Sequence, residues 1–214
     1  MNPIPLPLDF TRPTADEVAP ALLGHLLMRR VDNVWMGGEI VETEAYLVDD
    51  PACHAYVRET PRNRVMWGDY GFAYVFKIYG GYHCFNVVCR PQGRAEAVLI
   101  RAIEPTFGIE KMRELRPDKS DRELTNGPSK LCIALGIDSD DNGMPLSSPD
   151  SDLILADNPD RDAFLQTRAP MIQTTRIGLS KGVDWPLRWI LASSKSISRR
   201  GKAAEWPGES TRAK

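Results

Sequence analysis

The 214-residue sequence contains no apolar run long enough to span a bilayer, and its N-terminus, MNPIPLPLDF, lacks the charged start and apolar stretch of a secretory signal. We therefore expect a cytoplasmic protein without a membrane partner. Only four cysteines occur, all widely spaced, and in a reducing compartment we expect free thiols. Internal repeats and linker-like segments are also absent. These absences favour one domain over residues 1–193, followed by a polar, partly disordered tail over residues 194–214.

Metal-ligand spacings are missing as well. The side chains that could be grouped as ligands are those of Cys53, His54, His83 and Cys84. They form no CxxC or HxxxH pattern, which argues against a zinc site. The run from Asp138 to Gly143 begins like a calcium-binding loop, but its twelfth position is Pro149 in place of the bidentate glutamate. We therefore expect no bound metal.

The sequence has no large excess of either charge, with 27 basic and 29 acidic residues and a formal net charge of -2. This balance argues mildly against a nucleic-acid ligand, because phosphate contacts supply much of the affinity for DNA. The basic residues nevertheless cluster at Arg58, Arg62 and Arg64, and again at Lys195, Arg199, Arg200 and Lys202. Such clusters fit a local basic surface and, equally, two solvated loops.

Local patterns predict several helices and strands. Thr14 begins a capping-box pattern for a helix that ends near Gly24, and Pro20 predicts a kink or a new start within it. Strand patterns cover residues 26–31, 35–47 and 95–105. The first two strands would be joined by a turn at residues 32 and 33, and residues 37 and 38 are candidates for a bulge.

Residues 72–90 carry the clearest hairpin pattern, because two aromatic and β-branched runs flank Gly80 and Gly81. Two glycines can adopt the positive φ angles of a tight two-residue turn. Such a turn would place Tyr79 opposite Tyr82 at the hairpin tip. Aromatic side chains at a tip cannot be buried in their own sheet, so they are candidates for contact with another molecule.

The most informative segment is residues 39–56, EIVETEAYLVDDPACHAY. Alternation places Glu44 and Tyr46 on the same face of a strand that runs into a loop. A carboxylate that activates water and a ring that stacks suit chemistry on a flat aromatic substrate, although both residues also fit the wet face of an antiparallel strand.

Arg101 interrupts the otherwise apolar strand predicted over residues 95–105. We expect it either to pair with Glu44 or to reach solvent from an edge strand.

The segment NGPSKL opens a predicted helix over residues 129–136, with Pro128 suited to its first turn and Gly136 to its end. Exposed amide groups at such an N-terminus, beside Ser129 and Lys130, can hold a phosphate. Many helices begin in this way without a ligand, so both interpretations stay open.

Several motifs occur here in one order: ETEAY, the later His54, TPRNR, a YGGY hairpin followed by CFN, VLIRAIEP and NGPSKL. Together they resemble the alkyladenine (3-methyladenine) DNA glycosylase family, which is distinct from the helix-hairpin-helix glycosylases. The resemblance covers residues 14–190. It implies an α/β (mixed α+β) fold in a single compact domain, with a curved antiparallel sheet, flanking helices and a protruding β-hairpin.

The resemblance also implies a function. Such a protein would be a monomeric, monofunctional hydrolase without metal or organic cofactor, and in a bacterial cell it would be nucleoid-associated when bound to DNA. It would flip alkylated purines, and by extension deaminated ones, out of double-stranded DNA and cleave the N-glycosidic bond.

By the same resemblance, matching positions acquire roles. Glu44 would activate the water, while Arg101 and the backbone carbonyl of Leu179 would hold it. The base pocket would contain Tyr46, His54, Phe76 and Asn86. Tyr79 would intercalate into the DNA beside Gly81. The DNA backbone would be contacted by Arg62, Asn63, Arg64, Gly127, Ser129 and Lys130.

Some features depart from the family pattern. Phe76 stands where tyrosine occurs in the family, and Lys77 and Gly81 replace residues that are commonly apolar. The two-residue turn also conflicts with the pocket, because pairing Tyr79 with Tyr82 would put Asn86 and Phe76 on opposite faces of the hairpin. Either a bulge shifts the register or one pocket assignment is wrong.

Two rival classes of function and a bifunctional form of the enzyme are less consistent with the sequence. A zinc base deaminase needs HxE and PCxxC signatures, which the sequence lacks. A non-catalytic damaged-DNA-binding protein of the same fold would lack a working pair of Glu44 and Arg101, and both residues are present. No lysine lies within these motifs to form a Schiff base, which disfavours a bifunctional glycosylase/lyase.

Overall fold

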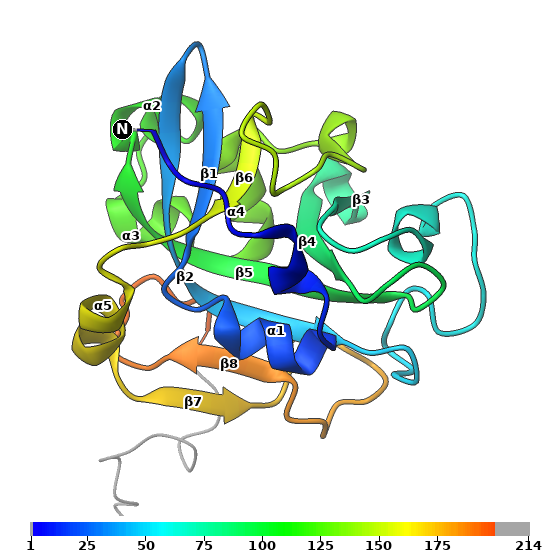
Figure 1. The fold of residues 1–214 in the computed structure, drawn as a ribbon. Coiled ribbons are helices and arrows are strands. Elements are labelled where there is room, and N and C mark those ends of the chain that lie inside the picture. Colours follow the sequence, from blue (N-terminus) through cyan, green and yellow to red (C-terminus); the bar gives the residue numbers. More distant parts are fainter. Residues whose placement is uncertain (1, 200–214) are drawn as a thin grey trace, which may run out of the picture.

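An eight-stranded antiparallel sheet is the framework of residues 2–199, which are the residues that this computed structural model describes (Figure 1). Its strands are β1 (Leu26–Val31), β2 (Val34–Tyr46), β3 (Ala73–Lys77), β4 (His83–Cys89), β5 (Glu96–Phe107), β6 (Leu153–Ala156), β7 (Met171–Thr174) and β8 (Arg188–Leu191). The main strand order is β3-β4-β5-β2-β1-β6, with β8 also paired to β2 and β7 paired to β8. The expected mixed α+β fold in a single compact domain with an antiparallel sheet is confirmed.

The helices are α1 (Ala15–Ala21), α2 (Ile109–Leu115), α3 (Asp121–Leu124), α4 (Pro128–Leu135) and α5 (Arg161–Arg168). The capping box at Thr14 is formed with Glu17, and α1 ends three residues before Gly24. Helix α4 begins at Pro128 and is capped by Gly136 in the left-handed conformation, as the sequence predicts. None of the helices among residues 2–199 combines the length and hydrophobicity that a membrane span requires.

Strands β2 and β5 form the centre of the sheet, and their pairing is irregular at two places. The register shifts at Gly37, as the glycine pair predicts, and again around Glu42. Arg101 has no partner in this register, because Glu42 pairs with Ala102 and Thr43 pairs with Ile100. A bulge of this kind redirects side chains, and here it lets two successive carboxylates of β2 approach one guanidinium.

The two faces of the central sheet are used differently. Thr43 points towards α1, where its hydroxyl donates to the carbonyl of Ala19, and apolar side chains fill this interface. Glu42 and Glu44 alternate with Thr43 and therefore point to the opposite face. The N-terminus of α4 and the loop before β8 approach that face, and a cavity lies between them.

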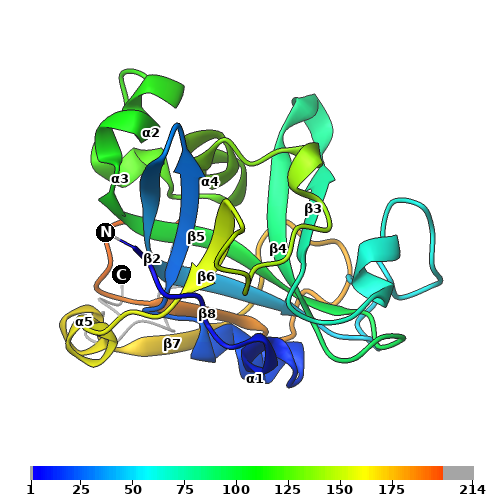
Figure 2. The ribbon, with the colours of Figure 1, turned by 45° about the horizontal axis from the view of Figure 1, so that its top comes forward.

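The hairpin of β3 and β4 stands at one edge of the sheet (Figure 2), and its turn differs from the predicted geometry. Tyr79, Gly80 and Gly81 form a three-residue turn, closed by a hydrogen bond from the Ile78 amide to the Tyr82 carbonyl. The prediction that Tyr79 faces Tyr82 across a two-residue turn is therefore wrong. Both glycines do adopt positive φ angles, of 78° and 83°, but Tyr79 joins them and lengthens the turn by one residue.

The longer turn changes the register of the hairpin by one residue. Phe76 now pairs with Cys84, and Tyr74 pairs with Asn86. Because alternate residues share a face, Asn86 and Phe76 lie on the same side of the hairpin. The predicted conflict disappears without a bulge in the strands.

The chain continues beyond β8 as a segment that folds back on the sheet. Within residues 194–199, which we call the return segment, Ser194, Ser196 and Ile197 are buried. The rest of the predicted tail, including Arg200 and Lys202, lies outside the described residues.

Candidate active site

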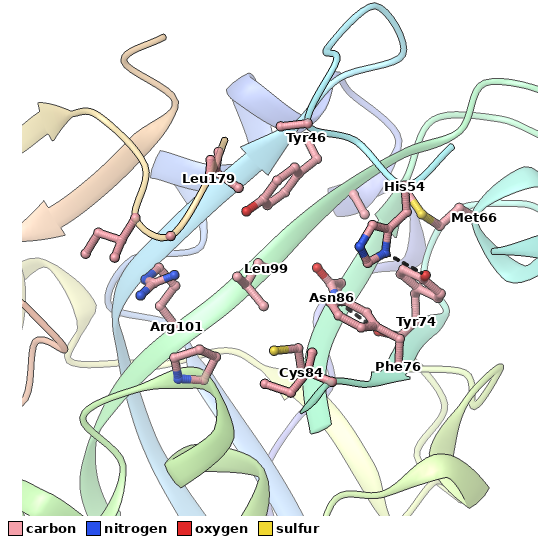
Figure 3. A pocket seen from close by; sticks show the side chains of 16 residues that line it. Tyr46, His54, Met66, Tyr74, Phe76, Cys84, Asn86, Leu99, Arg101 and Leu179 are labelled. Atoms are coloured by element: carbon pink, nitrogen blue, oxygen red, sulfur yellow. Dashed lines mark hydrogen bonds between the residues drawn. The ribbon is translucent and has the colours of Figure 1, made fainter. Parts of the chain in front are cut away.

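A cavity of about 360 Å³ opens on the sheet face that carries Glu44. Its wall includes all four residues predicted for a base pocket, which are Tyr46, His54, Phe76 and Asn86. Arg101 and Leu179 also line it (Figure 3). These residues come from β2, β3, β4, β5 and two loops, so the sheet and the corrected hairpin register bring together positions up to 133 residues apart.

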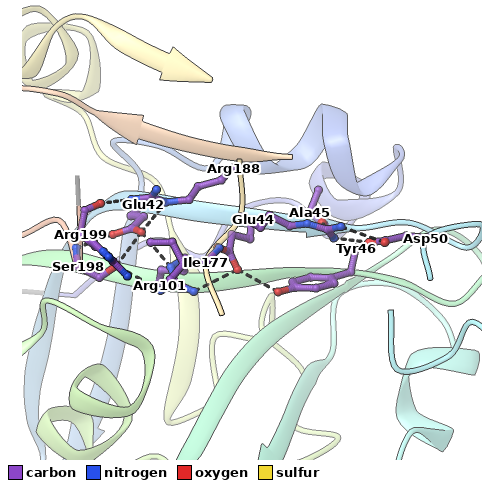
Figure 4. Close-up of polar contacts among 11 residues, drawn as sticks. Glu42, Glu44, Ala45, Tyr46, Asp50, Arg101, Ile177, Arg188, Ser198 and Arg199 are labelled. Carbon is purple, nitrogen blue, oxygen red and sulfur yellow. Dashed lines mark hydrogen bonds and ion pairs between the residues drawn. The ribbon is translucent and has the colours of Figure 1, made fainter. Parts of the chain in front are cut away.

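Glu44 lies directly behind this wall and has no exposed surface. Its Oε2 accepts hydrogen bonds from the Tyr46 hydroxyl at 2.9 Å and from Nη1 of Arg101 at 3.1 Å. Its Oε1 accepts a hydrogen bond from the Ile177 amide at 2.9 Å (Figure 4). The wet-face alternative for Glu44 is therefore wrong. Since a carboxylate has about four lone-pair positions, three bonds leave one for a further donor.

The predicted pairing of Arg101 with Glu44 is confirmed, and its alternative, an arginine reaching solvent, is wrong because only 7% of Arg101 is exposed. Burial opposes the charge on Arg101, but Glu44 and Glu42 outweigh it and raise the pKa of the guanidinium, so it stays protonated. Burial, followed by the charge of Glu44, raises the pKa of Tyr46 well above its usual value. The phenol therefore stays a hydrogen-bond donor.

The far side of the cavity is aromatic and uncharged. The rings of His54 and Phe76 meet edge to face with centroids 4.4 Å apart, and Nδ1 of His54 lies 3.0 Å from the Tyr74 hydroxyl. Burial, aided by Arg62, lowers the pKa of His54, and burial raises the pKa of Tyr74 to about 12. Both groups are thus neutral near pH 7 and can present polar atoms without charge.

Asn86 supplies a fixed polar edge to this cavity. Its Nδ2 donates to the carbonyl of Tyr74 at 3.0 Å, which sets the orientation of the amide. The amide oxygen is left facing the cavity (Figure 3). Asn86 can therefore accept a hydrogen bond from the edge of a flat ligand.

Arg176 is a site residue that the sequence analysis missed. Its guanidinium lies 4.7 Å from the centroid of the Tyr46 ring, forms an ion pair with Asp50 and donates to the carbonyl of Ala45 at 2.9 Å. Neither side chain of the ion pair is exposed. These contacts of Arg176 hold in place the loop in which Ile177 and Leu179 line the cavity. No spacing rule could pair residues 126 positions apart, so only the buried-charge argument applied to Arg176 could have suggested a partner.

The residues predicted to contact DNA surround the cavity, but they differ in exposure. Tyr79 is 99% exposed at the hairpin tip and follows Ile78, which lines the cavity. Arg62 lies over the Phe76 ring at 5.4 Å and donates to the carbonyl of Lys77, so it also ties the loop to the hairpin. Gly81 is exposed beside Tyr79.

The remaining predicted DNA contacts lie in the segment around Asn63 and at the N-terminus of α4. Asn63 is buried, and its side chain bonds to the loop's own backbone at His54, Arg58 and Thr60. Arg64 is exposed and pairs with Glu59. At the start of α4, Gly127 and Ser129 flank Pro128, which lines the cavity, and Lys130 donates to Asn126.

The four side chains that could have formed a zinc site, Cys53, His54, His83 and Cys84, are not arranged as metal ligands. Burial raises the pKa of both Cys53 and Cys84 to about 11, so both are protonated thiols at neutral pH. His83 contacts Ser139 instead. Among residues 2–199, no group of three or more His, Cys, Asp or Glu side chains is arranged to hold a metal ion.

Comparison with known proteins identifies the family of this chain. A protein from Carboxydothermus hydrogenoformans is 44% identical over 195 residues, which cover 91% of this chain and 99% of the relative. Proteins from Methanoculleus marisnigri and Francisella tularensis are each 43% identical, covering 91% and 86% of this chain and 99% and 93% of the relatives. All three are provisionally named 3-methyladenine DNA glycosylase. The profile of the methylpurine-DNA glycosylase family matches residues 9–195, and the chain therefore belongs to this family of DNA-repair hydrolases.

Proposed function

We propose that this protein acts as a monomer on double-stranded DNA, flips an alkylated purine such as 3-methyladenine into the cavity, and hydrolyses its N-glycosidic bond with a water activated by Glu44. The observation that carries the proposal is the position of Glu44, a buried carboxylate held by three groups of the cavity wall.

The cavity suits one base rather than a base pair. Its volume of about 360 Å³ is at the lower end for small-molecule sites, and its lining is mainly aromatic and apolar. A base stacked within a duplex could not bring its C1′ atom to a carboxylate behind such a wall. Base flipping is therefore part of the proposal, and Tyr79 would fill the gap that the extruded base leaves.

Selectivity for alkylated purines would come from their charge. Stacking of a cationic base on Tyr46 or Phe76 would contribute about 1 kcal/mol or more over a neutral base when the site is desolvated. His54 and Tyr74 are neutral near pH 7 and do not repel such a base. Asn86 would accept a hydrogen bond from the base edge.

The proposed reaction is a hydrolysis through an oxocarbenium-like state. The C1′–N bond breaks, and its electron pair goes to the purine, which leaves as a neutral molecule because alkylation had made it positive. A water oxygen bonds to C1′ while its proton passes to Glu44. The carboxylate also stabilises the developing positive charge, and Arg101 and the carbonyl of Leu179 would hold the water. Deaminated purines, which are neutral, would leave more slowly.

The proposal is tested by chromatography of the bases released from methylated duplex DNA and from inosine-containing duplex DNA. We expect free 3-methyladenine, slower release of hypoxanthine, intact abasic strands and no covalent complex after borohydride treatment. Binding to lesion DNA without release of any base would instead identify a non-catalytic damaged-DNA-binding protein. A borohydride-trapped complex would identify a lyase.

A further inference from the structure

Glu42 is a second buried carboxylate on the same face of β2, two residues before Glu44, and the proposed mechanism gives it no part. It has no exposed surface. Its Oε1 accepts hydrogen bonds from Nε of Arg101 at 2.9 Å, from Nε of Arg188 at 2.8 Å and from the Ser198 hydroxyl at 2.8 Å. Its Oε2 accepts a hydrogen bond from the Ser198 amide at 2.6 Å. Four donors thus satisfy this carboxylate (Figure 4).

Two carboxylates and two guanidinium groups therefore meet in one buried network. Arg188 is 1% exposed, and its Nη2 donates to the backbone carbonyl of Arg199. Removing either carboxylate would leave a buried positive charge without a full partner, which is costly in a site of low dielectric constant. Glu42 therefore balances the charge that Arg101 and Arg188 bring beside Glu44.

The network also fixes the orientation of Arg101. Its Nε donates to Glu42, its Nη1 donates to Glu44 at 3.1 Å, and its Nη2 donates to the Ser198 hydroxyl at 3.3 Å. Three hydrogen bonds from different nitrogen atoms define the plane of a guanidinium. The group is held in one orientation only when all of these donors are engaged. Two of these three anchors are Glu42 and Ser198.

Ser198 belongs to the return segment, residues 194–199, and not to the sheet. Ile197 is buried next to it and Ser196 is also buried, so packing holds the backbone at this point. The Ser198 amide and hydroxyl both reach Glu42, 156 positions earlier in the sequence. The end of the described chain thus packs against Glu42, behind the candidate active site.

We infer that Glu42 and Ser198 are positioning residues for the reaction, because together they hold Arg101 where it can orient Glu44 and the attacking water. The inference rests on the proposed function. In this role, Ser198 acts on the chemical step through Arg101 and Glu42 and need not touch the base.

The test compares single-turnover base release, affinity for lesion-containing duplex DNA and thermal melting in four variants. Ser198→Ala removes one anchor of Arg101 and keeps the backbone amide. We expect base release to slow about tenfold while the dissociation constant stays within about twofold. Ser198→Thr keeps a hydroxyl group and should restore most of the rate. Glu42→Gln keeps the shape but removes the charge, and it should slow release by about a hundredfold.

Ser194→Ala is the matched control within the same segment. Ser194 is also buried, but its hydroxyl donates to Glu104 at 2.9 Å, away from Arg101. We expect this variant to lower the melting temperature as much as Ser198→Ala does and to keep the wild-type rate. Should Glu42→Gln fail to fold, the comparison of Ser198→Ala with Ser198→Thr and Ser194→Ala still decides the question.

Two results would overturn the inference. One is a folded Ser198→Ala protein that releases base at the wild-type rate. The other is an equal loss of rate in Ser194→Ala, which would reduce Ser198 to a merely structural role. A wild-type protein that releases no base would overturn the proposed function itself, and the inference with it, so the two failures are distinguishable.

Discussion

The Tyr46 hydroxyl donates a 2.9 Å hydrogen bond to Glu44, so one side chain both lines the cavity and orients the carboxylate behind it. Because burial and the charge of Glu44 raise the pKa of Tyr46, this donor is kept at any pH near neutrality. In the proposed mechanism, the ring and the hydroxyl of Tyr46 would therefore have separable functions, because the ring would stack on the base while the hydroxyl holds the carboxylate.

Substitution of Tyr46 should separate these functions. Tyr46→Phe keeps the ring, so we expect excision of charged and neutral lesions to fall by the same factor, about tenfold, through loss of a hydrogen bond to a charged group. Tyr46→Ala also removes the stacking surface, so cationic 3-methyladenine should lose about fivefold more than neutral hypoxanthine. Single-turnover rates on the two substrates measure both effects. Equal losses for both lesions in Tyr46→Ala would rule out a cation–π contribution.

Intercalation of Tyr79 predicts that its substitution slows excision from duplex DNA and not from single-stranded DNA. Its side chain is 99% exposed, so Tyr79→Ala should leave the melting temperature unchanged. Loss of an inserted ring forfeits roughly 1–3 kcal/mol of stacking, and we expect excision from duplex DNA to slow about tenfold or more. The matched control, Tyr79→Trp, keeps a stacking ring and should retain the rate. Excision from a single-stranded substrate should not change in either variant, and a parallel loss there would argue against intercalation.

The lowered pKa of His25 predicts how the free energy of unfolding depends on pH. Burial, with a contribution from Arg161 and against the effect of Asp157, lowers the pKa of His25 from 6.5 to about 4. Between these values the unfolded chain binds a proton that the folded chain does not, so the free energy of unfolding falls as the pH falls from 6.5 towards 4. Between pH 7 and pH 5 the loss should be roughly 2 kcal/mol.

Urea unfolding at pH 7 and pH 5 tests this linkage. His25→Gln removes the titrating ring, so its stability should fall by roughly 2 kcal/mol less than that of the wild type over the same interval. His25 is 8% exposed and lies outside the cavity lining, so base release near neutral pH should be retained. Parallel pH profiles for the two proteins would show that His25 titrates normally in the fold.

Strand alternation predicted part of the candidate site, whereas the other pocket residues, which are His54, Phe76, Asn86 and Leu179, followed from the family resemblance. Glu44 and Tyr46 share a face by period alone, and the cost of an unpaired charge in an apolar strand predicted that Arg101 would pair with Glu44. The hairpin was harder. Both glycines were correctly placed in the turn, but glycine pairs are compatible with turns of two or three residues, and a change of one residue reverses which side chains share a face.

Long-range partners were not predictable from the sequence. In the sequence, Glu42 looks like any other carboxylate on an alternating strand. Nothing in the sequence around it indicates that Ser198 donates hydrogen bonds to it. The ion pair of Arg176 with Asp50 is equally hidden, because both residues lie in loops without periodicity. Such contacts are set by how the loops pack across the sheet, which depends on tertiary structure and not on local pattern.

The central claim is that Glu44 activates the water, and Glu44→Gln tests it most directly. The amide keeps the size of the side chain but cannot take a proton from water. We predict that single-turnover release of 3-methyladenine falls by at least about a thousandfold, since general-base catalysis alone contributes 10²–10⁴-fold. A gel shift should show wild-type affinity for lesion-containing duplex DNA. Base release by Glu44→Gln at a rate near that of the wild type would contradict the account.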